Sequence, residues 1–198
     1  MPTPLLHHLA RACTVAALLC AFAPSARASI ERLDLAAIVV KSDGAIEGTI
    51  TRSRVVRIDD AKDGPELYFT LLTIEGRSLA DGTPRTVEVF FAGGFVDARH
   101  GVFNSEAPAA DDVRLGNKIV AFYKHTDNAG GGMAGNALYA AHGGLYRAFD
   151  AAQGAIVQGR GDGYALVENV RLDALRAQVA ELARAKAHRA AEAKEKRR

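Results

Sequence analysis

The sequence predicts a mainly β protein, a small antiparallel barrel or sandwich followed by a C-terminal α-helix. About eight short runs rich in Val, Ile, Thr, Phe and Tyr are separated by clusters of Gly, Asp, Asn and Pro, a spacing typical of antiparallel sheets. The strands do not alternate with amphipathic helices, as those of a parallel sheet would. A helical period follows the last β-prone run, in residues 171–198.

Residues 1–28 are predicted to be a cleavable signal peptide. Arg11 supplies a positive charge, and residues 13–23 form an unbroken run of small and apolar residues. This run is about half of the ~20 residues that span a bilayer, so it is not expected to be retained as a membrane helix. No second long apolar stretch follows it, so no transmembrane segment is expected after cleavage. A signal peptidase would recognise the small residues Ala26 and Ala28. The mature chain would then begin at Ser29. We therefore expect an exported protein, periplasmic or extracellular.

Both cysteines, Cys13 and Cys20, lie in this predicted signal peptide. The mature chain would then carry no disulfide, no cysteine nucleophile and no cysteine-based zinc site. Attachment of lipid at Cys20 is the weaker alternative, because it requires a small residue at the preceding position and Leu19 stands there.

The rest of the chain divides into two parts of opposite charge. Residues 29–170, the predicted β domain, contain 14 basic and 19 acidic residues, whereas residues 171–198 contain nine basic and four acidic residues. An acidic body with a basic tail lacks the positive surface of a nucleic-acid-binding domain, so no nucleic acid partner is expected.

The first half of the β domain contains three predicted strands after a short segment at 33–41 and a turn at 42–44. Their residue ranges are 46–58, 67–74 and 86–91. In the third, Val87, Val89 and Phe91 occupy every second position, which places them on one face of the strand. The Gly93-Gly94 pair ends this strand.

The second half contains shorter predicted strands separated by glycines. Residues 95–115 are expected to form an irregular crossover, and residues 126–135 a glycine-rich hairpin loop. The strands of this half are predicted at 118–124, 138–142, 145–149, 155–158 and 164–168. The last two would form a hairpin around Gly-Arg-Gly-Asp-Gly, which is good turn chemistry.

The C-terminal segment is predicted to be an amphipathic helix. Its large apolar residues recur at i, i+3, i+7 and i+10, and they are Leu172, Leu175, Val179 and Leu182. This face is expected to dock on the barrel or on a partner. Beyond Leu182 only alanines and polar or charged residues remain, so the end of the helix is expected to project into solvent and fray.

The order of these elements resembles a broad group of small exported bacterial proteins with an OB-like or netrin-like β-barrel. The matching segments are 45–50, 67–74, 87–94, Pro108 and 114–123. The resemblance covers about residues 35–168 and implies a fold more than an activity. Netrin-like metalloprotease inhibitors place an N-terminal cysteine on the metal, and the mature chain has none, so that activity is not expected.

The residues most able to carry chemistry are three histidines, His100, His125 and His142. Brought together in space, three imidazoles would bind zinc and leave a position open. The alternative is three unrelated histidines, which the absence of a His-x-x-x-His spacing favours. No cofactor is expected.

Other sequence patterns that could indicate a binding site are explained more simply as turns and loops. The acidic cluster at 59–66 lacks the ligand spacing of a calcium loop, and the glycines at 130–135 lack the Lys-Ser/Thr of a phosphate-binding loop. Arg160-Gly161-Asp162 matches a cell-adhesion tripeptide but also fits a turn. No Gly-x-Ser-x-Gly or Ser-x-x-Lys motif marks a nucleophile.

Three functions remain open at this point. The first is an exported, non-enzymatic binding or accessory protein whose barrel binds a protein, a glycan or an envelope component. The second is a hydrolase or metal-dependent enzyme whose site is assembled from scattered residues. The third is an assembly protein that oligomerises through its C-terminal helix.

Overall fold

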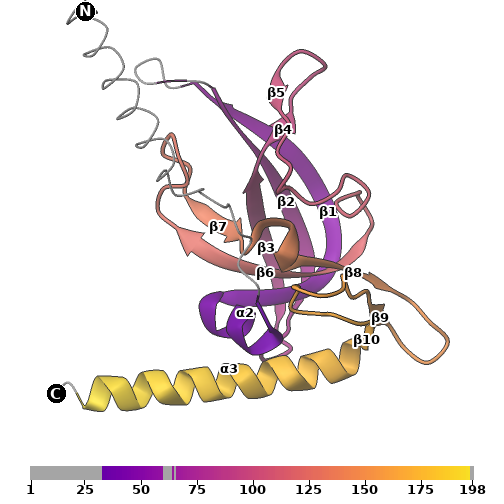
Figure 1. Ribbon diagram of the computed structural model, residues 1–198, viewed down its shortest axis with the longest axis vertical. Coiled ribbons are helices and arrows are strands. Elements are labelled where there is room, and N and C mark those ends of the chain that lie inside the picture. The colour runs from indigo at the N-terminus through magenta and orange to yellow at the C-terminus, as the bar shows by residue number, and fades with distance from the viewer. Residues whose placement is uncertain (1–32, 60–63, 65, 197–198) are drawn as a thin grey trace, which may run out of the picture. The chain divides into compact units, whose positions relative to one another are not determined.

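The computed structural model describes residues 33–59, 64 and 66–196; the predicted signal peptide and its cleavage site lie outside them (Figure 1). Within these residues five strands form a closed β-barrel, as one of the two predicted architectures requires. In order around the barrel they are β1 (Gly44–Ile58), β2 (Leu67–Ser78), β3 (Pro84–Ala92), β7 (Gly135–Leu138) and β6 (Lys118–Thr126). The barrel closes because β6 also pairs with β1.

Neighbouring barrel strands are antiparallel except β3 and β7, which run parallel. The remaining strands lie outside this ring. They are β4 (Gly94–Phe95) and β5 (Gly101–Val102), which form a separate hairpin, and β8 (Leu145–Phe149), β9 (Ile156–Val157) and β10 (Val170–Arg171), which extend the sheet from β6.

Three segments differ from the sequence-based expectation. The predicted strand at 138–142 ends at Leu138, because Ala140 and Ala141 have left-handed φ angles of 55° and 49° and a short 3₁₀ helix, η1 (Ala141–Gly144), follows. Residues 164–168 form no strand, since β9 pairs instead with β10. The crossover at 95–115 contains the β4–β5 hairpin.

The barrel interior is filled by one face of each strand. The predicted alternation in β3 is correct, because Val87, Val89 and Phe91 all belong to this interior cluster together with Leu72 and Ile119. Phe90, on the opposite face of β3, is also buried and packs edge-on against Phe69 of β2, with 5.6 Å between the ring centres. Burial on both faces explains why β3 is more apolar than a half-exposed strand.

A second core lies under two helices. The segment at 33–41 contains the helix α2 (Leu35–Lys41), which begins at Asp34, whose side chain accepts a hydrogen bond from the Ala37 N–H at 2.7 Å. The C-terminal helix is α3 (Leu172–Glu195). Figure 1 shows α3 beside α2, and both helices pack against buried residues of β6 and β8, among them Phe122 and Tyr146.

The apolar face of α3 is used inside the chain. Leu175 and Val179 are each 1% exposed, and Leu172 and Leu182 pack against the same cluster. Docking extends one turn beyond Leu182, since Lys186 Nζ donates to the Ser42 carbonyl oxygen at 2.5 Å, just past the end of α2. Neither this helix nor any other in the described residues is long and apolar enough to cross a membrane.

An ion pair ties α3 to the barrel. Arg176 Nε lies 2.7 Å from Glu47 Oε2, and its Nη2 lies 2.6 Å from Oε1, so the guanidinium binds the carboxylate in a two-pronged arrangement. The Glu47 side chain, on β1, is 10% exposed. The hydrogen bond to Glu47 raises the pKa of Arg176.

Replacing Arg176 by alanine should destabilise the protein by about 1–3 kcal/mol, because it leaves the Glu47 carboxylate buried without its partner. The measurement is the free energy of unfolding in urea. Arg189→Ala is the matched control, since Arg189 is an exposed arginine on the same helix. Equal losses in the two variants would show that the ion pair does not stabilise the docked helix.

Stability should also fall with acidification because of Asp173 in the first turn of α3. The Arg171 guanidinium and then the Ala174 N–H hold the pKa of Asp173 at about 2, against an ordinary 3.8. A lowered pKa means that the ionised carboxylate stabilises the fold above pH 3.8 and that this contribution is lost as the pH falls toward 2. In Asp173→Asn the free energy of unfolding should therefore change less between pH 4 and pH 2; an unchanged pH dependence would contradict this.

Candidate functional site

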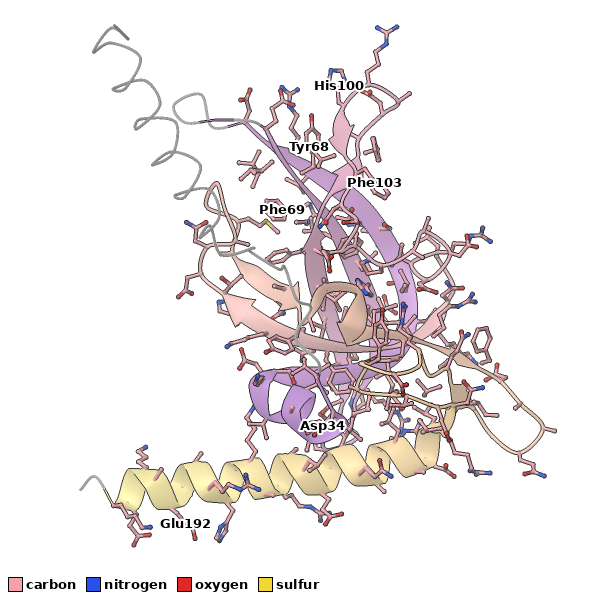
Figure 2. All side chains as sticks on the ribbon, viewed as in Figure 1. Asp34, Tyr68, Phe69, His100, Phe103 and Glu192 are labelled. Atoms are coloured by element: carbon pink, nitrogen blue, oxygen red, sulfur yellow. The ribbon has the colours of Figure 1, made fainter. Side chains whose placement is uncertain are left out.

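The β4–β5 hairpin exposes large apolar side chains. The exposed fractions are 56% for Phe95, 53% for Val96, 45% for Val102 and 81% for Phe103. Figure 2 shows His100 at the tip of this hairpin and Phe103 nearer its base. Clustered apolar residues on the surface of a folded protein commonly mark an interaction site, whereas single ones need no explanation.

The position of the hairpin depends on Gly94, where the chain leaves β3. Gly94 has a φ of 131°, and a Cβ there would lie 2.4 Å from Thr70 Oγ1 and 2.9 Å from Val55. The turn is fixed from β2, because the Tyr68 carbonyl accepts the Gly93 N–H at 2.7 Å and the Thr70 hydroxyl donates to the Gly93 carbonyl at 2.7 Å. The Gly93-Gly94 pair thus ends β3 as expected and directs the hairpin away from the barrel.

A groove of about 520 Å³ lies beside the hairpin. Phe95, Val102 and Phe103 line one part of it, and Ala107 to Ala110 of the crossover line another. The crossover is held in place by Asn104, whose amide donates to the Ala92 carbonyl at 2.9 Å and accepts from the Glu106 N–H at 3.0 Å. The irregular segment predicted from its Pro and Asp residues is therefore a fixed wall of the groove.

His142 lines the groove but makes hydrogen bonds on both sides of its ring. Nδ1 lies 3.1 Å from the Glu106 carbonyl oxygen, which only accepts, so Nδ1 carries the hydrogen. In the neutral ring Nε2 then accepts from the Tyr164 hydroxyl at 2.9 Å. The left-handed conformations of Ala140 and Ala141 precede this histidine. Such conformations are costly for alanine and are tolerated where the surroundings fix them.

Arg160 also lines the groove, and its guanidinium is held by contacts with other parts of the chain. Its Nη2 lies 2.5 Å from Asp112 Oδ2, its Nε donates to the Leu145 carbonyl at 3.1 Å, and its guanidinium lies over the rings of Tyr146 and Tyr164. The arginine of the Arg-Gly-Asp sequence is thus bound to the protein itself rather than displayed. This role is not predictable from the sequence, because Asp112 lies 48 residues away from Arg160 in the chain.

The other two histidines each have a different acidic neighbour. His100 Nδ1 lies 2.8 Å from Asp97 Oδ2, and His125 Nε2 lies 3.4 Å from Asp127 Oδ1. Throughout the described part of the chain, no group of three or more His, Cys, Asp or Glu side chains is placed to hold a metal ion. The three candidate zinc ligands therefore do not form a common site there.

Two further sequence patterns are located by the structure. The glycine-rich segment joins β6 to β7 as a hairpin loop, where Asn128 Oδ1 accepts the N–H groups of Gly130 and Gly132. Asp60 and Asp63 of the acidic cluster at 59–66 lie outside the described residues. Its last member, Glu66, pairs with Arg57 and accepts a hydrogen bond from Tyr68, which lowers the pKa of Glu66.

Comparison with protein-family models, with curated proteins and with solved structures finds no match for this chain. The groove and its residues are therefore interpreted from their own geometry.

Phe103→Ala should leave the free energy of unfolding within about 0.5 kcal/mol of wild type, because the side chain is largely exposed. It should nevertheless lower the fluorescence of the neutral apolar dye Nile red bound to the protein. Phe149→Ala is the control, since Phe149 is also an exposed phenylalanine, 42% exposed, but is not among the residues lining the groove. Equal dye binding in the two variants would show that the groove is not an accessible apolar site.

Proposed function

We propose that this chain is an exported, non-enzymatic binding protein that holds an apolar segment of a partner protein in the groove beside the β4–β5 hairpin. The observation that carries the proposal is the gathering of Phe95, Val102 and Phe103, all substantially exposed, on one side of a groove of about 520 Å³. Aromatic side chains are enriched in the cores of protein interfaces and supply much of their binding energy.

The barrel supports a binding role. Five strands in the order β1-β2-β3-β7-β6, closed by the β1–β6 pair, match the description of an OB-like fold, a five-stranded Greek-key barrel. OB-like barrels commonly serve as binding folds. Here Thr70 of β2 and Phe91 of β3 line the groove from the barrel side. The predicted signal peptide supports action outside the cytoplasm, in the periplasm or the medium.

The polar lining favours a protein segment over a glycan. A glycan is held by hydrogen bonds as well as by stacking, and it needs polar groups that are available. Of the five polar residues that line the groove, Ser105 is the exception, and the side chains of Thr70, Asn104, His142 and Arg160 are hydrogen-bonded to other parts of the chain. The groove therefore offers a ligand chiefly apolar contact. The same engagement of its polar side chains supports binding rather than catalysis.

The proposal is tested by replacing Phe103 with the photoreactive analogue p-benzoylphenylalanine in cells that make the protein. Irradiation should join position 103 to a discrete second polypeptide. The same analogue at Val40, an apolar residue of α2 that is 45% exposed and does not line the groove, is the control and should give no such product. Equal products from both positions, or none from position 103, would overturn the proposal. A product containing carbohydrate would indicate a glycan ligand instead, and a product of twice the mass a second copy of the chain.

Truncation is a poorer test of the helix. Leu175 and Val179 are buried in the second core, so removing residues 171–198 would expose Ile38, Phe122 and Tyr146 and destabilise the domain. If a partner failed to bind the truncated protein, this would not show that the tail binds the partner, because the domain itself would be destabilised. Point variants on the hairpin avoid this difficulty, because they leave both cores intact.

A further inference from the structure

A second, polar pocket lies on the other side of Arg160. Its volume is about 260 Å³. The residues that line it are Asp112, Arg147, Gln158, Gly159, Arg160 and Tyr164. Arg160 therefore belongs to both the apolar groove and this pocket, but the two differ in character, since this one is walled by charged and amide side chains.

Arg147, in β8, is the unusual residue of the pocket. Its side chain is partly buried, yet its hydrogen bonding is limited to Nη2, which donates to Asn117 Oδ1 at 3.2 Å. Its Nε is buried with no hydrogen-bond partner, and its guanidinium lies 4.6 Å from the centre of the Phe149 ring. Among the described residues no carboxylate forms an ion pair with it. A partly buried charge without a counter-charge is destabilising and calls for an explanation.

The neighbouring charges indicate which charge a ligand of this pocket would carry. Arg160 is neutralised by Asp112, at 2.5 Å, and both of these side chains are about one-fifth exposed. Arg147 then leaves the pocket with one uncompensated positive charge. A single carboxylate restores neutrality, whereas a doubly charged phosphate would leave an excess negative charge. The planar guanidinium also matches a carboxylate geometrically, because Nη1 and Nη2 carry parallel N–H groups that can bind two oxygens, whereas Nε is buried.

We propose that this pocket binds the carboxylate group of a ligand, with Arg147 as its main anchor and Gln158 and Arg160 beside it. The proposal does not depend on the function proposed for the groove, because its anchor, Arg147, does not line the groove. A free small acid and the C-terminus of a peptide share this chemistry.

The test uses the purified protein labelled with ¹⁵N and titrated with sodium acetate, with sodium chloride at equal ionic strength as the reference. Acetate should shift the Arg147 Nε–Hε and Gly159 amide signals saturably, with a Kd on the order of millimolar. Arg147→Gln should weaken this binding about tenfold or more. Arg52→Gln, at an exposed arginine on β1 outside the pocket, should leave it unchanged. No saturable shift, or equal binding in Arg147→Gln, would overturn the proposal.

Thermal unfolding separates a ligand anchor from a structural residue. As an anchor, Arg147 costs stability when the pocket is empty, so Arg147→Gln should have a Tm equal to or above that of wild type. Acetate should raise the Tm of wild type and of Arg52→Gln but not of Arg147→Gln. A lower Tm in Arg147→Gln, with no dependence on acetate in any variant, would show a purely structural arginine.

The source of the carboxylate is resolved by comparing N-acetylphenylalanine with its amide. Tighter binding of the acid than of acetate, with no binding of the amide, would identify a peptide C-terminus. Equal binding of the acid and acetate would identify a free small carboxylate; either result supports the carboxylate site. Because these probes report on Arg147 and the cross-link reports on position 103, failure of one proposal is distinguishable from failure of the other.

Discussion

The structure depends on one long strand that pairs on both sides. β1 contacts β2 along almost its whole length and β6 along its first part, and only this double pairing closes the barrel. To do so β1 must bend, which Figure 1 shows as a continuous curve. A register shift between Ile50 and Arg52 marks a bulge where the pairing with β6 ends, and bulges bend a strand and increase its twist. Gly48 and Gly76, opposite each other before it, lie so close that a Cβ on Gly76 would meet the Glu47 carbonyl oxygen at 1.9 Å.

Both candidate sites follow from this closure. Beyond the bulge, β1 and β2 continue as a ribbon past β6, and the β4–β5 hairpin is built against this ribbon through Val55 and Thr70. The crossover from β3 to β6 runs along one end of the barrel, where it forms the groove wall and supplies Asp112 to Arg160. The last irregular segment brings Arg160 and Tyr164 back to the same place. Residues far apart in sequence thus meet at one end of the barrel.

The strand framework was predictable, because local patterns determine it. Alternation in β3 and the β-prone runs at 46–58 and 67–74 require no knowledge of their partners. The apolar period of α3 was equally visible. Features set by distant contacts were not predictable from local patterns. They are the left-handed Ala140 and Ala141, where a strand was expected to continue, and the pairing of β9 with β10. The sites were missed for the same reason, since neither Phe103 nor Arg147 belongs to a recognisable motif.

The packing of α3 has a consequence for the order in which the molecule folds. The barrel is complete once β7 has been made, but the second core stays open until residues 172–182, which follow all the barrel strands, have been made as well. Until then Ile38, Phe122 and Tyr146 have no cover from α3. A growing chain therefore carries this apolar surface without its cover from the time that β6 and β8 are made until α3 follows them. The second core is thus completed later than the barrel.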